Sequence, residues 1–160
     1  MALITKELNI EELYKLYLQH PSVQTDTRKL KAGDIYFALK GPNFNGNSFA
    51  NQALDAGAAY AVVDEIEYAT NNQCIYVDDV LQTLQSLAKH HRQQFNIPFI
   101  AITGSNGKTT TKELVTTVLR TKYKTYATHG NLNNHIGVPL TVLGIPADVE
   151  MAVIEMGANH

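Results

Sequence analysis

Apolar and polar positions along the first half of the chain predict alternating helices and strands. Asn9 precedes a helical stripe of apolar residues, and Glu12 stands three positions later, as in a capping box. Short apolar runs bounded by turn residues predict buried strands. Such runs lie at 35–39, 59–63 and 75–77, with helices expected at 49–56 and from Asp78 or Asp79 to about Gln94. This alternation is typical of an α/β fold.

After Pro98 the pattern becomes strand, glycine-rich loop, helix and strand. Strands are expected at 98–103, about 124–127 and 151–155, with a helix from about 108 to 121. Helices between strands predict a parallel sheet, which binds ligands at the carboxyl ends of its strands. Because three strands are few for such a sheet, we expect the chain to be the front portion of a longer enzyme. The predicted fold is α/β, with a small mixed domain at 1–95 and the start of a P-loop parallel-sheet domain at 96–160.

Composition narrows the class of protein. The 160 residues are 44% apolar and 18% charged, as in soluble globular proteins. The net charge of −2, without a long basic run, argues against broad nucleic-acid binding. The single cysteine, Cys74, excludes an internal disulfide framework and is expected to be a buried thiol on a strand. With no 18-residue apolar stretch and no secretion-signal pattern, we expect a cytoplasmic protein without a membrane span.

The loop from Gly104 to Thr110 carries the strongest chemical signal. It reads Gly-Ser-Asn-Gly-Lys-Thr-Thr between a predicted strand and a predicted helix. Its glycines let backbone N–H groups turn toward an anion, and the start of the helix adds a partial positive charge. Lys108 is placed to reach terminal phosphates, and the Thr109 hydroxyl is placed to hold Mg²⁺. The expected ligand is therefore a nucleoside triphosphate.

The loop departs from the usual P-loop spacing, because Ile102 stands where the first glycine would be if the motif ended at Gly107. A tight strand-to-helix turn with an exposed lysine is the alternative interpretation. The order of strand, loop and helix favours the phosphate site.

Glu155 and an asparagine-rich segment are further candidates. Glu155 follows the apolar run 151–154 and is expected at the tip of a buried strand, where it would bind Mg²⁺ directly or through water. An exposed carboxylate or a helix-cap partner is the alternative. Segment 128–139 holds three asparagines, whose amides suit a polar binding wall, although an ordinary loop fits the composition equally well. His90 and His91 have polar neighbours on a predicted helix and are expected to face solvent.

Three strings resemble the Mur ligases. They are Thr-Gly-Ser-Asn-Gly-Lys-Thr-Thr-Thr-Lys-Glu at 103–113, Gly-Asn-Leu-Asn-Asn-His-Ile-Gly-Val-Pro at 130–139 and Val-Ile-Glu-Met-Gly-Ala-Asn-His at 153–160. The N-terminal part agrees through residues 26–28, 31–41 and 45–49. Two departures are Ala32, where family members often have proline, and Asn45-Gly46-Asn47, where they often have Asp-Gly-His. The second change removes the histidine, which argues against a catalytic or ligand role for this turn.

The resemblance implies an ATP- and Mg²⁺-dependent ligase of peptidoglycan precursor synthesis. In such an enzyme the terminal carboxylate of a UDP-N-acetylmuramoyl-tripeptide attacks the γ-phosphate of ATP. The amine of D-alanyl-D-alanine then attacks the acyl phosphate to form an amide. The resemblance also implies a UDP-sugar-binding domain followed by a truncated ATP-binding domain. We expect the whole enzyme to be a monomer, and this chain alone to be inactive.

The same resemblance assigns roles to individual residues. Backbone N–H groups of the loop would hold the phosphates, Lys108 would offset charge on the transferred group, and Thr109 and Glu155 would hold Mg²⁺. Asn133 or Asn134 would orient phosphate or substrate. Thr27 and Arg28 would contact the UDP part, with a plain surface ion pair as an equal alternative for Arg28. The nucleotide-binding set is Gly104, Ser105, Asn106, Gly107, Lys108, Thr109 and Thr110, and the catalytic pair is Lys108 and Glu155.

Two other functions stay open at this point. One is another ligase of the same superfamily with a different acceptor. The other is a P-loop kinase or a nucleotide-binding module without ligase chemistry. A ligase requires acceptor-binding domains further along the chain, whereas a kinase carries its phosphoacceptor site within one fold.

Overall fold

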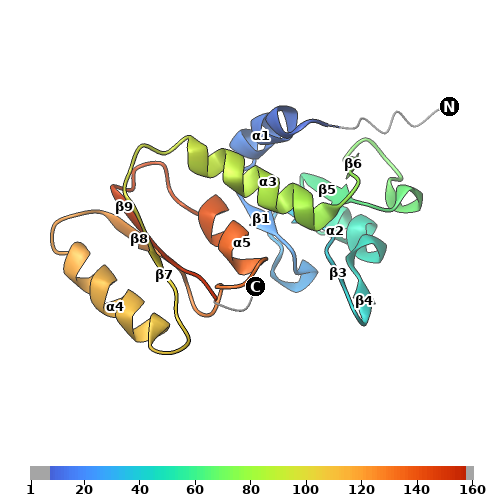
Figure 1. The fold of residues 1–160 in the computed structure, drawn as a ribbon. Helices are drawn as coiled ribbons and strands as arrows, with labels where there is room; N and C mark the ends of the chain where they lie inside the picture. The colour runs from blue at the N-terminus through green and yellow to red at the C-terminus, as the bar shows by residue number, and fades with distance from the viewer. Residues whose placement is uncertain (1–7, 158–160) are drawn as a thin grey trace. The chain divides into compact units, whose positions relative to one another are not determined.

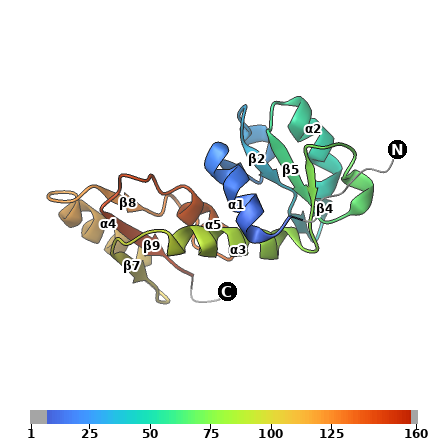
Figure 2. The same cartoon turned by 90° about the horizontal axis from the view of Figure 1, so that it is seen from above.

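The computed structural model describes residues 8–157, which form two compact units (Figure 1 and Figure 2). The units meet at His90 and His91, inside helix α3 (Val80–Gln93). The predicted domain boundary at 95/96 lies five residues further along the chain, because the apolar pattern of α3 continues past the point where the units divide. The last three residues of the Mur-like string at 153–160 lie outside the described residues.

The first unit is built on a four-stranded parallel sheet. Its strands are β1 (Val23–Gln24), β2 (Ile35–Phe37), β5 (Tyr60–Val63) and β6 (Cys74–Tyr76), in the order β1-β2-β5-β6. The apolar runs predicted as strands form β2, β5 and β6, because continuous apolar sequence suits strands that are covered on both faces. Cys74 is a buried free thiol on β6, as expected.

The two long helices of this unit, α1 (Ile10–Gln19) and α3, begin at side-chain caps that the sequence predicts. The Asn9 side chain accepts a hydrogen bond from the Glu12 N–H, and the Glu12 carboxylate accepts one from the Asn9 N–H. This capping box starts α1, which buries Leu13 and Tyr17. Asp79 accepts from the Gln82 N–H at the start of α3. The remaining helices are α2 (Ala50–Asp55), η1 (Thr27–Lys29), η2 (Gly46–Phe49) and η3 (Ile66–Tyr68).

Two short strands that were not predicted form a hairpin. They are β3 (Lys40–Gly41) and β4 (Phe44–Asn45), and they pair antiparallel. Two-residue strands carry too little apolar alternation to be recognised in a sequence.

The prediction that both histidines of α3 face solvent is wrong. His91 is buried, and its ring lies 4.9 Å from that of Phe95. His90 is half-buried, with its ring 4.6 Å from that of Tyr14. His91 follows Leu84 and Leu87 at spacings of seven and four, so it continues the buried stripe of the helix.

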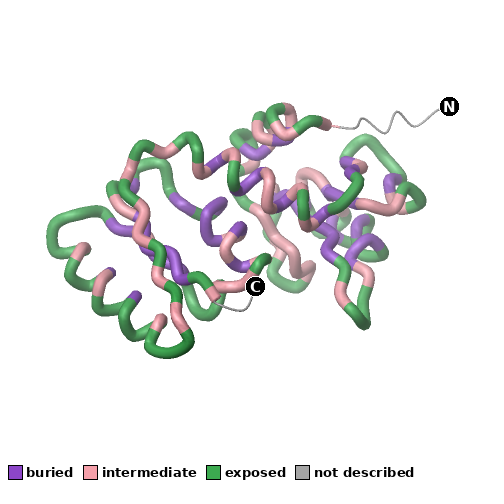
Figure 3. The backbone as a smooth tube through the Cα atoms, in the orientation of Figure 1, coloured by how far each residue is buried: buried purple, intermediate pink, exposed green. Residues whose placement is uncertain are grey.

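The second unit is a three-stranded parallel sheet with one helix on each face. Its strands β7 (Phe99–Ile102), β8 (Thr125–Ala127) and β9 (Met151–Glu155) lie in the order β7-β9-β8. All three were predicted within two residues at either end. Along β9, Ala152 and Ile154 belong to the apolar core, while Glu155 points to the opposite face, as alternation requires. Helix α4 (Lys108–Leu119) packs on that second face, and its outer side is exposed (Figure 3).

Helix α5 (Gly137–Leu143) was not predicted, because its first turn lies in the segment interpreted as a loop. Pro139 is its third residue, where the N–H that proline lacks would have no helical partner. Gly137 is required by packing, since a Cβ there would lie 2.5 Å from the Leu132 backbone. Within residues 8–157, none of the helices is long and apolar enough to cross a membrane.

Candidate functional site

The glycine loop joins the end of β7 to the start of α4. Gly107, at φ 76°, is the residue before the helix and provides no side-chain cap. Within the described part of the chain, the backbone N–H groups from Gly104 to Thr109 donate no hydrogen bond. An uncapped helix start with free N–H groups is a ready site for an anion such as phosphate. The loop that the sequence predicted therefore has the geometry of a phosphate cradle.

Lys108 folds back over this loop. Its Nζ donates to the Gly104 carbonyl oxygen at 2.6 Å, and its side chain is half-buried. The ammonium group thus lies on the glycine loop itself, as the prediction requires. Ser105, Asn106 and Thr110 are exposed around it.

Glu155 stands at the tip of β9, beside the base of the loop. It is aligned with Ile102 of β7 and is 1% exposed, so the alternative of an exposed carboxylate is excluded. Its Oε1 accepts hydrogen bonds from Asn133 Nδ2 at 2.8 Å and from Thr109 Oγ1 at 3.3 Å. Its Oε2 has no hydrogen-bond partner among the described residues. A buried oxygen without a partner is unusual in a folded protein and marks a position where a ligand or ion fits.

These contacts bring together Thr109, Asn133 and Glu155 from three separate segments. A carboxylate, a hydroxyl and nearby phosphate oxygens are the ligand types that Mg²⁺ prefers. Among residues 8–157 there is no group of three or more His, Cys, Asp and Glu that would suit a different metal. The donor set at this position therefore fits Mg²⁺ bound together with a phosphate.

Lys112 also belongs to this cluster and was not predicted. Its side chain is 2% exposed, and Nζ lies 4.0 Å from Glu155 Oε2. Its position one helical turn after Lys108 was the signal in the sequence, because residues four apart share a face of a helix.

The two candidate asparagines have different partners. Asn133 reaches Glu155, as described above. Asn134 instead accepts, through its side-chain oxygen, hydrogen bonds from the N–H groups of Ile136 and Gly137, at 3.1 and 2.7 Å. Asn134 thereby shapes the start of α5.

Thr27 and Arg28 lie in the first unit, at a separate pocket of about 520 Å³. The Arg28 side chain donates to Asp26 at 2.9 Å from Nε and 2.8 Å from Nη2, so the ion pair considered from the sequence is present. Those hydrogen bonds lower the pKa of Asp26 to about 2. Aromatic side chains that the sequence analysis missed line the same pocket, namely Tyr36, Phe44 and Phe49. Phe44 and Phe49 are exposed, which gives the pocket flat apolar walls next to a guanidinium group.

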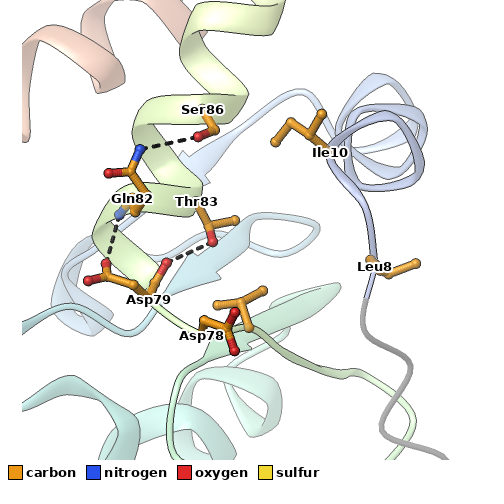
Figure 4. A pocket seen from close by; sticks show the side chains of 8 residues that line it. Leu8, Ile10, Asp78, Asp79, Gln82, Thr83 and Ser86 are labelled. Carbon is orange, nitrogen blue, oxygen red and sulfur yellow. Dashed lines mark hydrogen bonds between the residues drawn. The ribbon is translucent and has the colours of Figure 1, made fainter.

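A smaller pocket of about 280 Å³ lies at the start of α3 (Figure 4). Several of its polar groups bond to one another: Thr83 Oγ1 donates to the Asp79 carbonyl oxygen, and Gln82 Nε2 donates to Ser86 Oγ. Its lining includes Asp78 and Asp79, which the sequence offered as helix starts, but none of the residues predicted to bind nucleotide, metal or substrate. We therefore assign it no role in the site.

Comparison with known protein families finds two matches. Residues 21–92 match the catalytic domain of the Mur ligase family, and residues 102–160 match the Mur ligase middle domain. Curated relatives carry the name UDP-N-acetylmuramoyl-tripeptide–D-alanyl-D-alanine ligase. The one from Bacillus subtilis is 46% identical over 94% of this chain and 35% of its own length. The one from Escherichia coli is 43% identical over 87% of this chain and 30% of its own.

Solved structures agree with the curated relatives. A MurF structure from Acinetobacter baumannii superposes with a TM-score of 0.79 and 37% identity, covering 87% of this chain and 30% of that protein. A MurF ligase from Thermotoga maritima in complex with ADP gives a TM-score of 0.80 and 31% identity, over 89% of this chain and 33% of that protein. This chain spans about a third of the length of the curated relatives it matches.

Proposed function

Because this chain belongs to the Mur ligase family, we propose that the protein containing it joins D-alanyl-D-alanine to a UDP-N-acetylmuramoyl-tripeptide at the expense of ATP. The observation that carries the proposal is the buried Glu155 carboxylate beside Thr109 and the glycine loop, in a chain 46% identical to a ligase of that name. The reaction belongs to peptidoglycan precursor synthesis. We place it in the cytoplasm, where ATP and UDP-linked sugars are made, and expect the enzyme to act as a monomer.

The glycine loop would hold the β- and γ-phosphates of ATP. Its free N–H groups and the start of α4 offer donors and partial positive charge without further rearrangement. Lys108 would exchange the Gly104 carbonyl for a phosphate oxygen, which puts its charge where negative charge develops during transfer. The ADP complex of the Thermotoga maritima relative supports this assignment.

Thr109 and Glu155 would hold Mg²⁺. The ion supplies neutralisation of phosphate charge when it is bound. On the protein side, Glu155 contributes a carboxylate whose free oxygen is already buried at the site, and Asn133 fixes the other oxygen through its amide. Asn134 is a weaker candidate for contact with substrate, because its side-chain oxygen is engaged at the start of α5.

The pocket beside Thr27 and Arg28 would take the UDP part of the substrate. Aromatic faces such as Phe44 and Phe49 suit stacking with a nucleobase, and guanidinium groups suit phosphate. Binding at this pocket would hold the substrate, while its distant peptide carboxylate attacks the γ-phosphate to give an acyl phosphate. The amine of D-alanyl-D-alanine then displaces phosphate and forms the amide bond.

The test uses the full-length protein with ATP, Mg²⁺ and UDP-N-acetylmuramoyl-tripeptide. We expect phosphate release to depend on D-alanyl-D-alanine, and the mass of the UDP-peptide to increase by one D-alanyl-D-alanine residue pair. Single amino acids serve as control acceptors. If one of them replaces the dipeptide with greater efficiency, the protein is another ligase of this superfamily. Phosphate transfer to a product without an amide bond would contradict ligase activity altogether.

A further inference from the structure

Lys112 is a buried cation that the proposed mechanism does not yet use. It lies in the second turn of α4 and is 2% exposed. Lysine is almost never buried to this extent unless its ammonium group is paired, because removing that charge from water is costly. Its partners therefore indicate why the helix places a lysine here.

The ammonium group connects α4 with the ends of both neighbouring strands. Lys112 Nζ donates to the Thr128 carbonyl oxygen at 2.8 Å and lies 2.9 Å from Glu113 Oε1. Thr128 in turn accepts a hydrogen bond from the Glu155 N–H through its Oγ1, at 2.9 Å. Lys112 therefore fixes Thr128, and Thr128 in turn fixes the backbone of Glu155.

The distance from Lys112 to the Glu155 side chain is also informative. Nζ lies 4.0 Å from Oε2, which is too far for a hydrogen bond but close enough to balance the charge of a buried carboxylate. Oε2 consequently keeps its lone pairs free, while Oε1 is engaged by Thr109 and Asn133. A lysine in direct contact would have occupied the oxygen that the proposed function leaves to the metal.

We propose that Lys112 is a positioning residue of the nucleotide site. It fixes Glu155 through Thr128 and balances its charge from behind, so that Oε2 stays available for the Mg²⁺ that accompanies the nucleotide. This inference rests on the proposed function, in which Glu155 serves the metal. It concerns a residue outside the glycine loop and outside the metal ligands themselves.

The test is the gain in ADP affinity that Mg²⁺ provides, measured by calorimetry on the full-length protein. Lys112→Met keeps an unbranched side chain that is one atom shorter, and removes its charge. We expect the gain to fall about tenfold or more, since groups that orient metal ligands typically have effects of this size. Binding of ADP without Mg²⁺ should stay as in wild type, a result that general damage to the fold would not produce. Lys124→Met, at an exposed lysine of the same unit, should change neither value.

Two further variants separate the possible outcomes. Glu155→Gln should abolish the gain, and adding Lys112→Met to it should have no further effect, because both act through one carboxylate. If Lys112→Met does not fold, Lys112→Arg and Lys112→Gln replace it, and the charged variant should retain a larger gain than the neutral one. An unchanged or larger gain in Lys112→Met, or equal gains in the Arg and Gln variants, would overturn the role of Lys112. A wild type without any Mg²⁺-dependent gain would instead overturn the metal assignment of the proposed function.

Discussion

Asn47 has a structural role that depends on a partner far away in the sequence. It stands in the turn that lacks the family's frequent histidine, and it is fully buried. Its Nδ2 donates to Asp64 Oδ1 at 2.8 Å, and its Oδ1 accepts from the Asp64 N–H at 3.0 Å. Lys40 lies 3.0 Å from the same carboxylate. Asn47 is therefore structural, which the sequence could not reveal, because its partner lies 17 residues away.

Asp64 makes the first unit sensitive to acid. Burial raises its pKa, but hydrogen bonds from Asn47 and Lys40 outweigh burial and hold the pKa below its ordinary value of 3.8. A lowered pKa in the folded state gives stability that is present above 3.8 and is lost as the pH falls below it. We expect Asp64→Asn to weaken hydrogen-exchange protection of β5 at about pH 6, and the difference from wild type to shrink toward about pH 2. Asp55→Asn, at an exposed site, is the control; a difference that does not change with pH would contradict the prediction.

Lys108 allows the clearest test of catalysis at a single residue. We expect Lys108→Ala in the full-length enzyme to lower phosphate release by on the order of 10²-fold or more, since it removes charge where the transferred group develops it. Folding should be little affected, because the side chain lies on a loop and leaves no cavity in the core. Steady-state phosphate release at saturating ATP and circular dichroism measure the two effects. Activity within a factor of two of wild type would refute the role of Lys108.

At the scale of elements, the sequence predicts strands that have a clear apolar pattern. It misses elements and pockets that depend on contacts between distant residues. Apolar runs located β2, β5 and β6 of the first unit and all three strands of the second, and the position of Glu155 at the tip of β9 followed from one such run. The first turn of α5 was missed because Gly137 and Pro139 are typical of loops, although Asn134 supplies the acceptor that starts this helix. The aromatic walls of the Thr27 pocket come from a hairpin and a 3₁₀ turn, and only folding brings them together.

Gly107 sets the start of α4, and its substitution tests that element. For a residue other than glycine, a φ of 76° costs about 1–2 kcal/mol. A Cβ at this position would meet no atom within 4 Å, so backbone strain is the only penalty. We expect the free loop of Gly107→Ala to relax away from this φ, so that ADP must restore the strained conformation and binds about 5- to 30-fold more weakly. Gly107→Asn should lose less, because asparagine tolerates left-handed backbone better. Calorimetric titration with ADP measures both, and alanine binding as tightly as glycine would argue against a cradle built on this turn.

At the scale of the whole molecule, we expect this chain to bind substrate without catalysing ligation. This chain spans about a third of the length of its relatives, and it contains the glycine loop, the pocket proposed for UDP and the carboxylate proposed for Mg²⁺. Ligation requires three substrates held in line, which these parts do not supply by themselves. We expect the 160-residue chain to release heat on titration with UDP-N-acetylmuramoyl-tripeptide, yet to form no ADP in response to D-alanyl-D-alanine. Substrate-dependent turnover by the purified chain would show that its sites are more complete than we propose.

The strand order of the second sheet has a consequence for how the protein is made. In the first unit the strands pair in the order in which the ribosome produces them, β1-β2-β5-β6. In the second sheet, β7 and β8 flank β9 and do not pair with each other, so the central strand is the last of the three to be synthesised. Residues 103–107 therefore leave the ribosome about fifty residues before the strand that anchors them exists, since long-range parallel pairing must wait for both partners. The loop that we propose to hold phosphate therefore reaches its folded form late in translation, although its sequence motif is made early.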